Sequence, residues 1–130
     1  MMKRIIVLVF VLLASSVASA FITVGLDGDA DFNTIQAAID NASNGEEILV
    51  FDGVYKGDGN RDVDFNGKYV DLLSINGPSR CIIDCNGTAE VPHRAFIIPT
   101  SGRGNSLISG FTIINGYVTA EEGQEDYLSW

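Results

Sequence analysis

The hydrophobic residues beyond position 45 fall in short runs that are separated by turn residues. The runs lie at 48–51, 63–65, 69–75, 81–83, 95–98, 107–108 and 111–114. Asn-Gly pairs begin at positions 66, 76, 86 and 115, and both residue types readily adopt left-handed turn conformations. The pattern predicts many short β-strands, which occur in sandwiches, barrels and solenoids alike.

One segment before these runs has the period of a helix. The residues that share its apolar face are Ile35, Ala38, Ile39 and Ala42. Their spacing predicts a short amphipathic helix over 34–43. We expect Asn33 to be the N-cap, Gln36 to complete a capping box, and Gly45 to follow the C-terminal end.

Two features favour a solenoid among the all-β architectures. Comparable strand-turn units recur at 48–55, 70–78 and 107–117, and repeats of this spacing are typical of solenoids. The helix also precedes every strand that follows Gly45. At that position it would cover the core and the unpaired strand edges at one end of the coil.

The first residues of the chain have the three parts of a secretory signal peptide. Lys3 and Arg4 precede an apolar run at 5–13, and Ala18-Ser19-Ala20 form a small-residue cleavage site. The run is shorter than the ~20 residues that a membrane-spanning helix needs. We therefore expect residues 1–20 to be removed, no membrane span after cleavage, and a secreted or extracytoplasmic protein at the cell surface or in the periplasm.

The charge of the chain excludes one class of function. Acidic residues number 17 and basic residues 8, for a net charge of −9, and the predicted leader contains two of the basic residues and no acidic one. A nucleic-acid-binding protein needs a basic face to neutralise phosphates, so we expect no nucleic-acid partner.

Four segments carry a resemblance to a known family. They are DFNTIQAAID, EEILVFDGVY, DVDFNGKYVDLLSINGPSRCIIDCNG and LISGFTIINGY. In this order they resemble the N-terminal capping helix and first coils of secreted right-handed parallel β-helix proteins of the pectin-lyase-like group. The resemblance implies an all-β fold: a short right-handed parallel β-helix with an N-terminal amphipathic capping helix. About three coils are expected, near 46–68, 69–98 and 105–117, after a first strand at 21–24.

On this fold the chain divides into a signal peptide (1–20), the β-helix cap and coils (21–117), and an acidic, irregular tail (118–130). One set of side chains should stack inside the coils. Its expected members are Leu49, Phe51, Val70, Leu72, Ile75, Ile83, Phe96, Ile98, Leu107, Phe111 and Ile113.

The two cysteines, Cys81 and Cys85, lie four residues apart in a predicted strand. Strand geometry separates their Cα atoms by about 13 Å, whereas a disulfide needs less than about 7 Å. His93 is the only histidine, so a metal pair with a second Cys or His cluster is disfavoured. We expect buried free thiols on one face of the strand.

Oxygen-bearing side chains gather in one predicted corner. The weak candidates for a calcium site there are Asp58, Asn60, Asp62 and Asp64. The alternative is a solvated corner whose side chains bond to their own backbone. Another acidic stretch, at positions 27, 29, 31 and 33, lacks the glycine and glutamate of an EF-hand and predicts an acidic turn.

No catalytic residue and no cofactor-binding residue is assigned. In the resembled enzymes, Asp and Arg residues gather several coils further along, and the esterase members use Q-A-V and Q-D-T-type motifs that this chain lacks. No such pattern includes any of the four arginines beyond the leader, Arg61, Arg80, Arg94 and Arg103. His93 is expected to be a hydrogen-bonded or solvated loop residue.

The tail differs from the family, whose members continue with further Gly-rich coils, and this favours a truncated member. Otherwise either the tail folds over the open C-terminal end, or carbohydrate or another protein chain covers it. The function expected is that of an exported, non-catalytic β-helix protein or truncated fragment with a surface-binding or structural role. The alternative is the N-terminal part of a carbohydrate-active enzyme, of polysaccharide-lyase or pectinesterase type, whose active-site coils are missing.

Overall fold

The structure is a computed structural model that describes residues 21–98 and 105–119. The predicted leader and most of the predicted tail lie outside these residues. The described elements are β1 (Ile22–Val24), α1 (Ile35–Asn41), β2 (Glu47–Val50), β3 (Gly53–Lys56), β4 (Val63–Asp64), β5 (Asp71–Ser74), β6 (Cys81–Asp84), β7 (Phe96–Ile97), β8 (Ile108–Ser109) and β9 (Thr112–Ile114).

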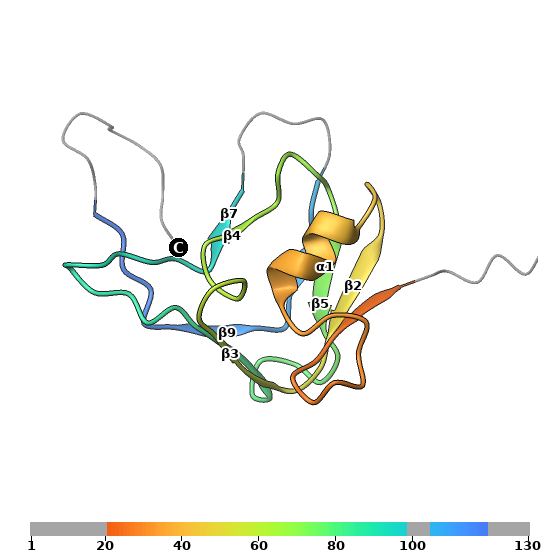
Figure 1. The fold of residues 1–130 in the computed structure, drawn as a ribbon, viewed down its shortest axis with the longest axis horizontal. Coiled ribbons are helices and arrows are strands. Elements are labelled where there is room, and N and C mark those ends of the chain that lie inside the picture. The colour runs from red at the N-terminus through yellow and green to blue at the C-terminus, as the bar shows by residue number, and fades with distance from the viewer. Residues whose placement is uncertain (1–20, 99–104, 120–130) are drawn as a thin grey trace, which may run out of the picture.

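The strands form three parallel sheets, in the orders β1-β2-β5-β8, β3-β6-β9 and β4-β7. In Figure 1 the three sheets surround a central space, with β4 and β7, β3 and β9, and β2 and β5 superposed in projection. The first two coils each contribute one strand to each wall, and the described part of the third coil adds β8 and β9 to two of them. The fold is a parallel β-solenoid of about three turns with one short helix, which confirms the predicted class and the three predicted coils.

In-register pairing stacks equivalent side chains inside the solenoid. One row consists of Ile22, Ile48, Leu72 and Ile108, which are partners along β1, β2, β5 and β8. Aromatic rings form a second row, in which Phe96 lies edge-to-face against Phe65 at 6.1 Å and against Phe111 at 6.3 Å. Burial of these apolar rows is the main stabilising contribution to such a fold.

The predicted inward set is partly correct. Val70, Leu72 and Ile83 are buried as expected, and Phe96 and Phe111 pack against the core. In β2 the prediction is wrong by one residue, because Ile48 and Val50 are buried while Leu49 and Phe51 are only partly covered. A one-residue shift reverses the two faces of a strand.

Three further predictions of inward stacking are wrong. Leu107 precedes Ile108, which pairs with Leu72, so it lies on the outer face and is exposed. Ile75 and Ile98 each follow the last residue of a strand and are exposed in the corners. The interior has room for alternate residues of the strands only, whereas the hydrophobic runs continue past them.

The predicted helix exists, but its caps differ from the prediction. Thr34 is the N-cap, and its side chain accepts a hydrogen bond from the amide of Ala37. Asn33 is therefore not the cap. The helix ends at Asn41 with Ala42 as the C-cap, so Gly45 lies beyond the capping turn, although its φ of +84° is left-handed.

The Asn-Gly pairs form corners of the solenoid, as expected. Asn66, Asn86 and Asn115 have φ values of 51°, 48° and 54°. The carboxylates of Asp64 and Asp84 each accept a hydrogen bond from the amide two residues further on, at 2.7 Å and 3.0 Å. This local Asx bond fixes the turn without help from distant residues.

Within the residues that the structure describes, no helix has the length and hydrophobicity needed to cross a membrane.

Candidate functional site

The N-terminal end of the solenoid is closed by α1, which lies across the central space in Figure 1. Its apolar face is fully buried at Ile35, Ala38 and Ile39. The amide of Ile35 donates to Asn60 Oδ1 at 3.0 Å, and Lys68 Nζ donates to the Ile39 carbonyl at 2.9 Å. Both helix ends are therefore satisfied by residues of the first coil.

The outer strand edges at this end also have partners. Gln36 Oε1 accepts from the Asp64 amide at 2.8 Å and its Nε2 donates to the Asp64 carbonyl at 2.9 Å, so one side chain occupies the edge of β4. On β1, the Thr23 amide donates to Asp31 and the Thr23 carbonyl accepts from the Phe32 amide. The hydrogen bonds from the Thr23 side chain and backbone hold the pKa of Asp31 below its ordinary value.

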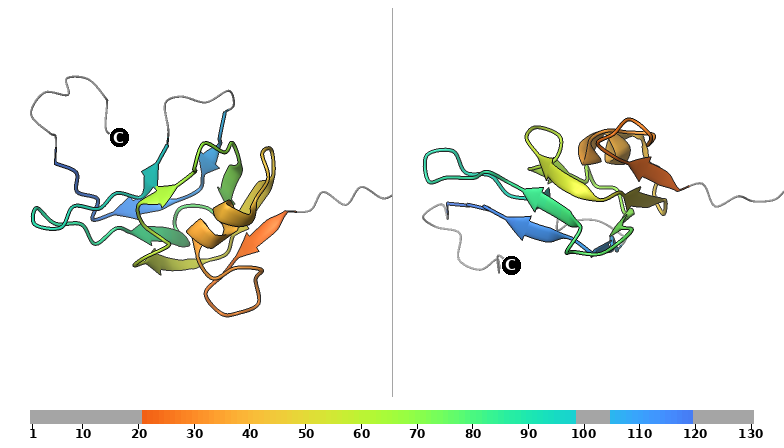
Figure 2. Two further views of the ribbon diagram at one scale, coloured as in Figure 1. Left: turned by 45° about the horizontal axis from the view of Figure 1, so that its top comes forward. Right: turned by 90° about the horizontal axis from the view of Figure 1, so that it is seen from below.

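The opposite end of the described solenoid is different. There β8 and β9 are the last strands of their sheets, and Figure 2 shows this third coil on the side away from α1. Ile113 stacks in register on Ile83, which is fully buried, yet Ile113 itself is 49% exposed. Its inward position is as predicted, and its exposure arises because no described coil covers it.

The backbone of the third coil also points outward. The amide of Leu72 donates to the Leu107 carbonyl at 2.7 Å, and the amide of Cys85 donates to the Ile114 carbonyl at 3.0 Å. Alternate residues of a parallel strand bond to opposite neighbours. The amides and carbonyls of Ile108 and Ile113 therefore face the outer edge, where no described strand pairs with them.

This outer edge carries none of the usual protection against strand pairing. Natural proteins guard exposed edges with charged residues, especially lysine, and with proline. Residues 105–119 contain neither a charged residue nor a proline, whereas charged residues recur throughout 46–94. We name residues 105–119 the open edge. Its composition is that of an unprotected strand edge, to which a further strand can pair.

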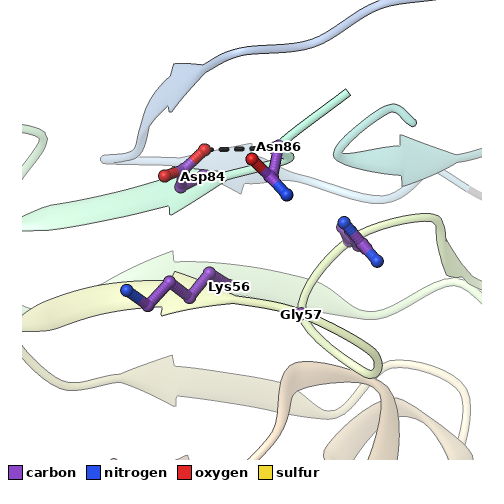
Figure 3. Close-up of a pocket in the computed structure, with 5 residues that line it drawn as sticks. Lys56, Gly57, Asp84 and Asn86 are labelled. Carbon is purple, nitrogen blue, oxygen red and sulfur yellow. Dashed lines mark hydrogen bonds between the residues drawn. The ribbon is translucent and has the colours of Figure 1, made fainter. Parts of the chain in front are cut away.

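A second feature is a polar hollow of about 360 Å³ on the side of the solenoid, lined by Lys56, Gly57, Arg61, Asp84 and Asn86 (Figure 3). Lys56 and Asp84 are register partners on β3 and β6, so their side chains share the outer face of that sheet. No pattern in the sequence predicts this hollow, because its members come from two successive coils.

Arg61 is the most enclosed cation of the hollow. Its Nη1 donates to the Cys85 carbonyl at 3.2 Å and its Nη2 lies 3.5 Å from the Asp58 carboxylate, whose side chain is fully exposed. Its Nε is buried and has no hydrogen-bond partner. An exposed ion pair contributes little stability, so the carbonyl bond is the stronger restraint on this guanidinium.

Asp84 is already engaged by its neighbours. The Asn115 side chain donates to it at 2.9 Å and the Asn86 amide at 3.0 Å. These two hydrogen bonds, with Lys56 nearby, hold the pKa of Asp84 below its ordinary value. Asp84 is therefore a carboxylate at neutral pH and a poor proton donor.

Asp62 connects the first coil to the second. Its Oδ2 lies 2.5 Å from His93 Nδ1, and its Oδ1 accepts from the Arg94 amide at 2.9 Å. Burial would raise the pKa of Asp62, but the bonds from Arg94 and His93 and the nearby charges of His93 and Arg61 hold it below its ordinary value. His93 is thus a hydrogen-bonded loop residue, in agreement with the prediction.

The four calcium candidates do not converge. Asp58 faces solvent beside Arg61, and Asn60 is turned toward the helix. Asp62 bonds to His93, and Asp64 accepts from the amide of Asn66. In the described part of the chain, no three His, Cys, Asp or Glu side chains gather as a metal site would require. The arrangement matches the alternative of backbone-bonding corner residues, and calcium binding stays a prediction.

Cys81 and Cys85 are both buried and free, which confirms the prediction. Burial, with Asp52 nearby, raises the pKa of Cys81 to about 11, and burial also raises the pKa of Cys85. Both are therefore protonated at neutral pH and poor nucleophiles. Two other arginines lie apart from these groups. The Arg80 guanidinium lies 3.4 Å from the Asp52 carboxylate at the surface, and Arg103 lies outside the described residues.

Comparisons with family models, with curated proteins and with solved structures found no match for this chain.

Proposed function

We propose that this chain is an exported, non-catalytic β-helix protein of the pectin-lyase-like kind with a structural role, and that its open edge accepts a β-strand from another protein chain. The observation that carries the proposal is the uncharged third coil, where Ile108 and Ile113 present backbone groups to the outside. The three-part leader supports export.

Strand addition is favoured by both backbone and side chains at this edge. An added strand would bond to the outward amides and carbonyls, and its side chains would cover Ile113 and the neighbouring Ile114, which is 40% exposed. Main-chain bonds supply affinity in such complexes, and alternate side chains supply specificity. At the opposite end, Gln36 already occupies the outer edge of β4, and the segment at 31–32 already occupies the outer edge of β1.

The described polar groups support a non-catalytic role. Asp62 and Asp84 have lowered pKa values and accept two hydrogen bonds each. His93 is paired, and the two thiols are buried. A general acid or base needs an available lone pair or proton, whereas the carboxylates of Asp62 and Asp84 already accept hydrogen bonds and the two thiols are buried.

Strand addition is tested with a fluorescent synthetic peptide that has the sequence of residues 105–119. We expect saturable binding to the purified protein, measured by fluorescence anisotropy, and no binding of the same peptide with prolines at the positions of Ile108 and Ile113, since proline cannot donate to a strand ladder. Equal binding of both peptides would contradict the proposal.

A second candidate is the N-terminal part of a carbohydrate-active enzyme, and the free Nε of Arg61 in the polar hollow favours it. The test is an assay for unsaturated product or released methanol on acidic polysaccharides, with and without Ca²⁺. We expect no turnover. Turnover that Arg61→Ala abolishes would replace the structural proposal with the enzymatic one.

A further inference from the structure

We infer that Asn115 is a site of spontaneous chemical modification, at which deamidation converts a neutral side chain of the third coil into a carboxylate. The chain contains five Asn-Gly pairs, beginning at positions 44, 66, 76, 86 and 115. Deamidation is fastest in this dipeptide, because the amide nitrogen of the next residue attacks the asparagine side chain and glycine hinders that attack least. The hydrogen bonds around the five pairs differ, and they leave one pair poised to react. The reaction does not depend on strand addition at the open edge.

The modification joins two neighbouring residues and needs only water. The Gly116 amide nitrogen attacks Asn115 Cγ, a C–N bond forms, and the amide proton passes to water. The Cγ–Nδ2 bond then breaks, and Nδ2 takes up a proton and leaves as ammonia. Water opens the resulting cyclic imide at either carbonyl, which leaves aspartate or isoaspartate at position 115. A pair therefore reacts readily only where the glycine amide is available and the asparagine side chain can turn toward it.

Three of the five glycine amides already donate a hydrogen bond. Their acceptors are the Tyr69 carbonyl for Gly45 (2.7 Å), Ser74 Oγ for Gly77 (2.9 Å) and the Asn115 carbonyl for Gly87 (2.8 Å). A nitrogen whose proton is held by an acceptor must break that bond before it can attack. The pairs at 44, 76 and 86 are therefore protected. Asn86 shows the distinction best, since its side chain has no hydrogen-bond partner within the described residues while the amide after it is bonded.

Asn66 is the remaining competitor, because the Gly67 amide has no hydrogen-bond partner in the described part of the chain. The Asn66 side chain, however, donates two hydrogen bonds, to Asp40 Oδ1 at 3.2 Å and to the Asp64 carbonyl at 3.3 Å. A further bond of 2.8 Å, from the amide at position 68 to the carbonyl at position 65, closes the turn around the pair. Side chain and backbone are both restrained at Asn66.

Asn115 combines an available amide with a lightly held side chain. The Gly116 amide has no partner among the described residues, both residues are exposed, and no described atom lies within 4 Å of a Cβ added at Gly116. One hydrogen bond holds the side chain, from Nδ2 to Asp84 Oδ1 at 2.9 Å. Deamidation replaces this donor by a carboxylate that faces Asp84, and like charges on adjacent strands repel each other. The third coil is then held less firmly to the second.

The test is a series of tryptic peptide maps of the folded protein, kept in mildly alkaline buffer for increasing times. Cleavage after Lys56, Lys68, Arg80 and Arg94 places each Asn-Gly pair on a different peptide. We expect the mass gain of deamidation to accumulate at Asn115 at least about tenfold faster than at Asn86, and faster than at Asn66. In urea all the pairs should react at similar rates, since the same dipeptide is then unprotected everywhere. Equal rates at Asn86 and Asn115 in the folded protein, or conversion led by Asn66, would overturn the assignment.

Two variants check the chemistry and its consequence. Gly116→Ala hinders the attack without contacting any described atom, so conversion at Asn115 should fall at least about tenfold while the free energy of unfolding stays the same. Asn115→Asp imitates one product and should speed hydrogen exchange of the Gly87 amide, whose acceptor is the Asn115 carbonyl. Unchanged conversion in Gly116→Ala would overturn attack by the Gly116 amide. Unchanged exchange at Gly87 in Asn115→Asp would overturn the loosening of the third coil.

Discussion

At the scale of single residues, Gly87 lies in close contact with the backbone of two other segments. A Cβ atom added there would lie 2.9 Å from the amide nitrogen and from the carbonyl oxygen of His93, and 3.0 Å from the amide nitrogen of Tyr117. All three atoms belong to the backbone, so no side-chain rotation relieves the contact. The second and third coils approach each other this closely only because position 87 has no side chain.

Gly87→Ala should therefore destabilise the protein by about 1–3 kcal/mol, the usual range for overpacking. Gly116→Ala is the matched control, because no atom lies within 4 Å of a Cβ at that position. Urea denaturation of both variants measures the difference. Equal stability of the two would show that the segments around residues 87, 93 and 117 are not packed as described.

Asp62 gives the protein a pH dependence whose sign follows from its lowered pKa. A carboxyl whose folded pKa lies below its unfolded value of about 3.9 contributes stability above that pH, and the contribution is lost as the pH falls through the folded pKa. Asp62→Asn should therefore reduce the free energy of unfolding at neutral pH, and the reduction should shrink in the acid range. Asp58→Asn, at a side chain in solvent, controls for the loss of one charge. A difference between Asp62→Asn and the unmodified protein that stays constant with pH would contradict this assignment.

At the scale of elements, the helix shows what local pattern can predict. Its apolar face and its position before the coils follow from the spacing of Ile35, Ala38 and Ile39. The N-cap does not follow from this spacing, because Asn33 and Thr34 are both good capping residues. Which of the two caps the helix depends on the path by which the chain enters it. Gln36 was expected to bond within the helix. Its side chain does donate to Asp40 in the helix, but it also bonds to β4, a strand that lies 28 positions away and whose location the local sequence does not reveal.

The strands show a similar limit. Corners at Asn66, Asn86 and Asn115 are predictable because Asn-Gly pairs determine the backbone locally. The inward face of β2 is not predictable, since positions 48–51 are apolar without a break and either alternation satisfies the pattern. The polar hollow is less predictable still, because Arg61 meets Asp84 and Asn86 only when two coils stack in register.

The capping assignment can be tested with two neighbouring substitutions. Thr34→Ala removes the hydroxyl that accepts from the Ala37 amide and should lower the free energy of unfolding by about 0.5–2 kcal/mol. Asn33→Ala should change it little, because the Asn33 side chain is exposed and does not cap the helix. Thermal or urea denaturation measures both. A larger loss of unfolding free energy for Asn33→Ala than for Thr34→Ala would instead identify Asn33 as the N-cap, as the sequence alone predicts.

At the scale of the whole molecule, the two ends of the described solenoid differ in how their strand edges are hydrogen-bonded. At the N-terminal end, Gln36 bonds to the edge of β4, and the segment at 31–32 bonds to the edge of β1. At the other end of the described residues, the backbone groups of Ile108 and Ile113 remain directed outward. The proposed strand addition rests on this difference between the two ends of the described solenoid.

Site-resolved hydrogen exchange of the backbone amides tests this claim most directly. The amides of Leu72 and Cys85 donate to the third coil from within the solenoid, so they should exchange slowly at every protein concentration and serve as references. The amides of Ile108 and Ile113 should exchange more slowly when the 105–119 peptide is bound than in the free protein. Exchange of Ile108 and Ile113 that stays rapid at saturating peptide, with Leu72 and Cys85 still protected, would contradict strand addition at the open edge.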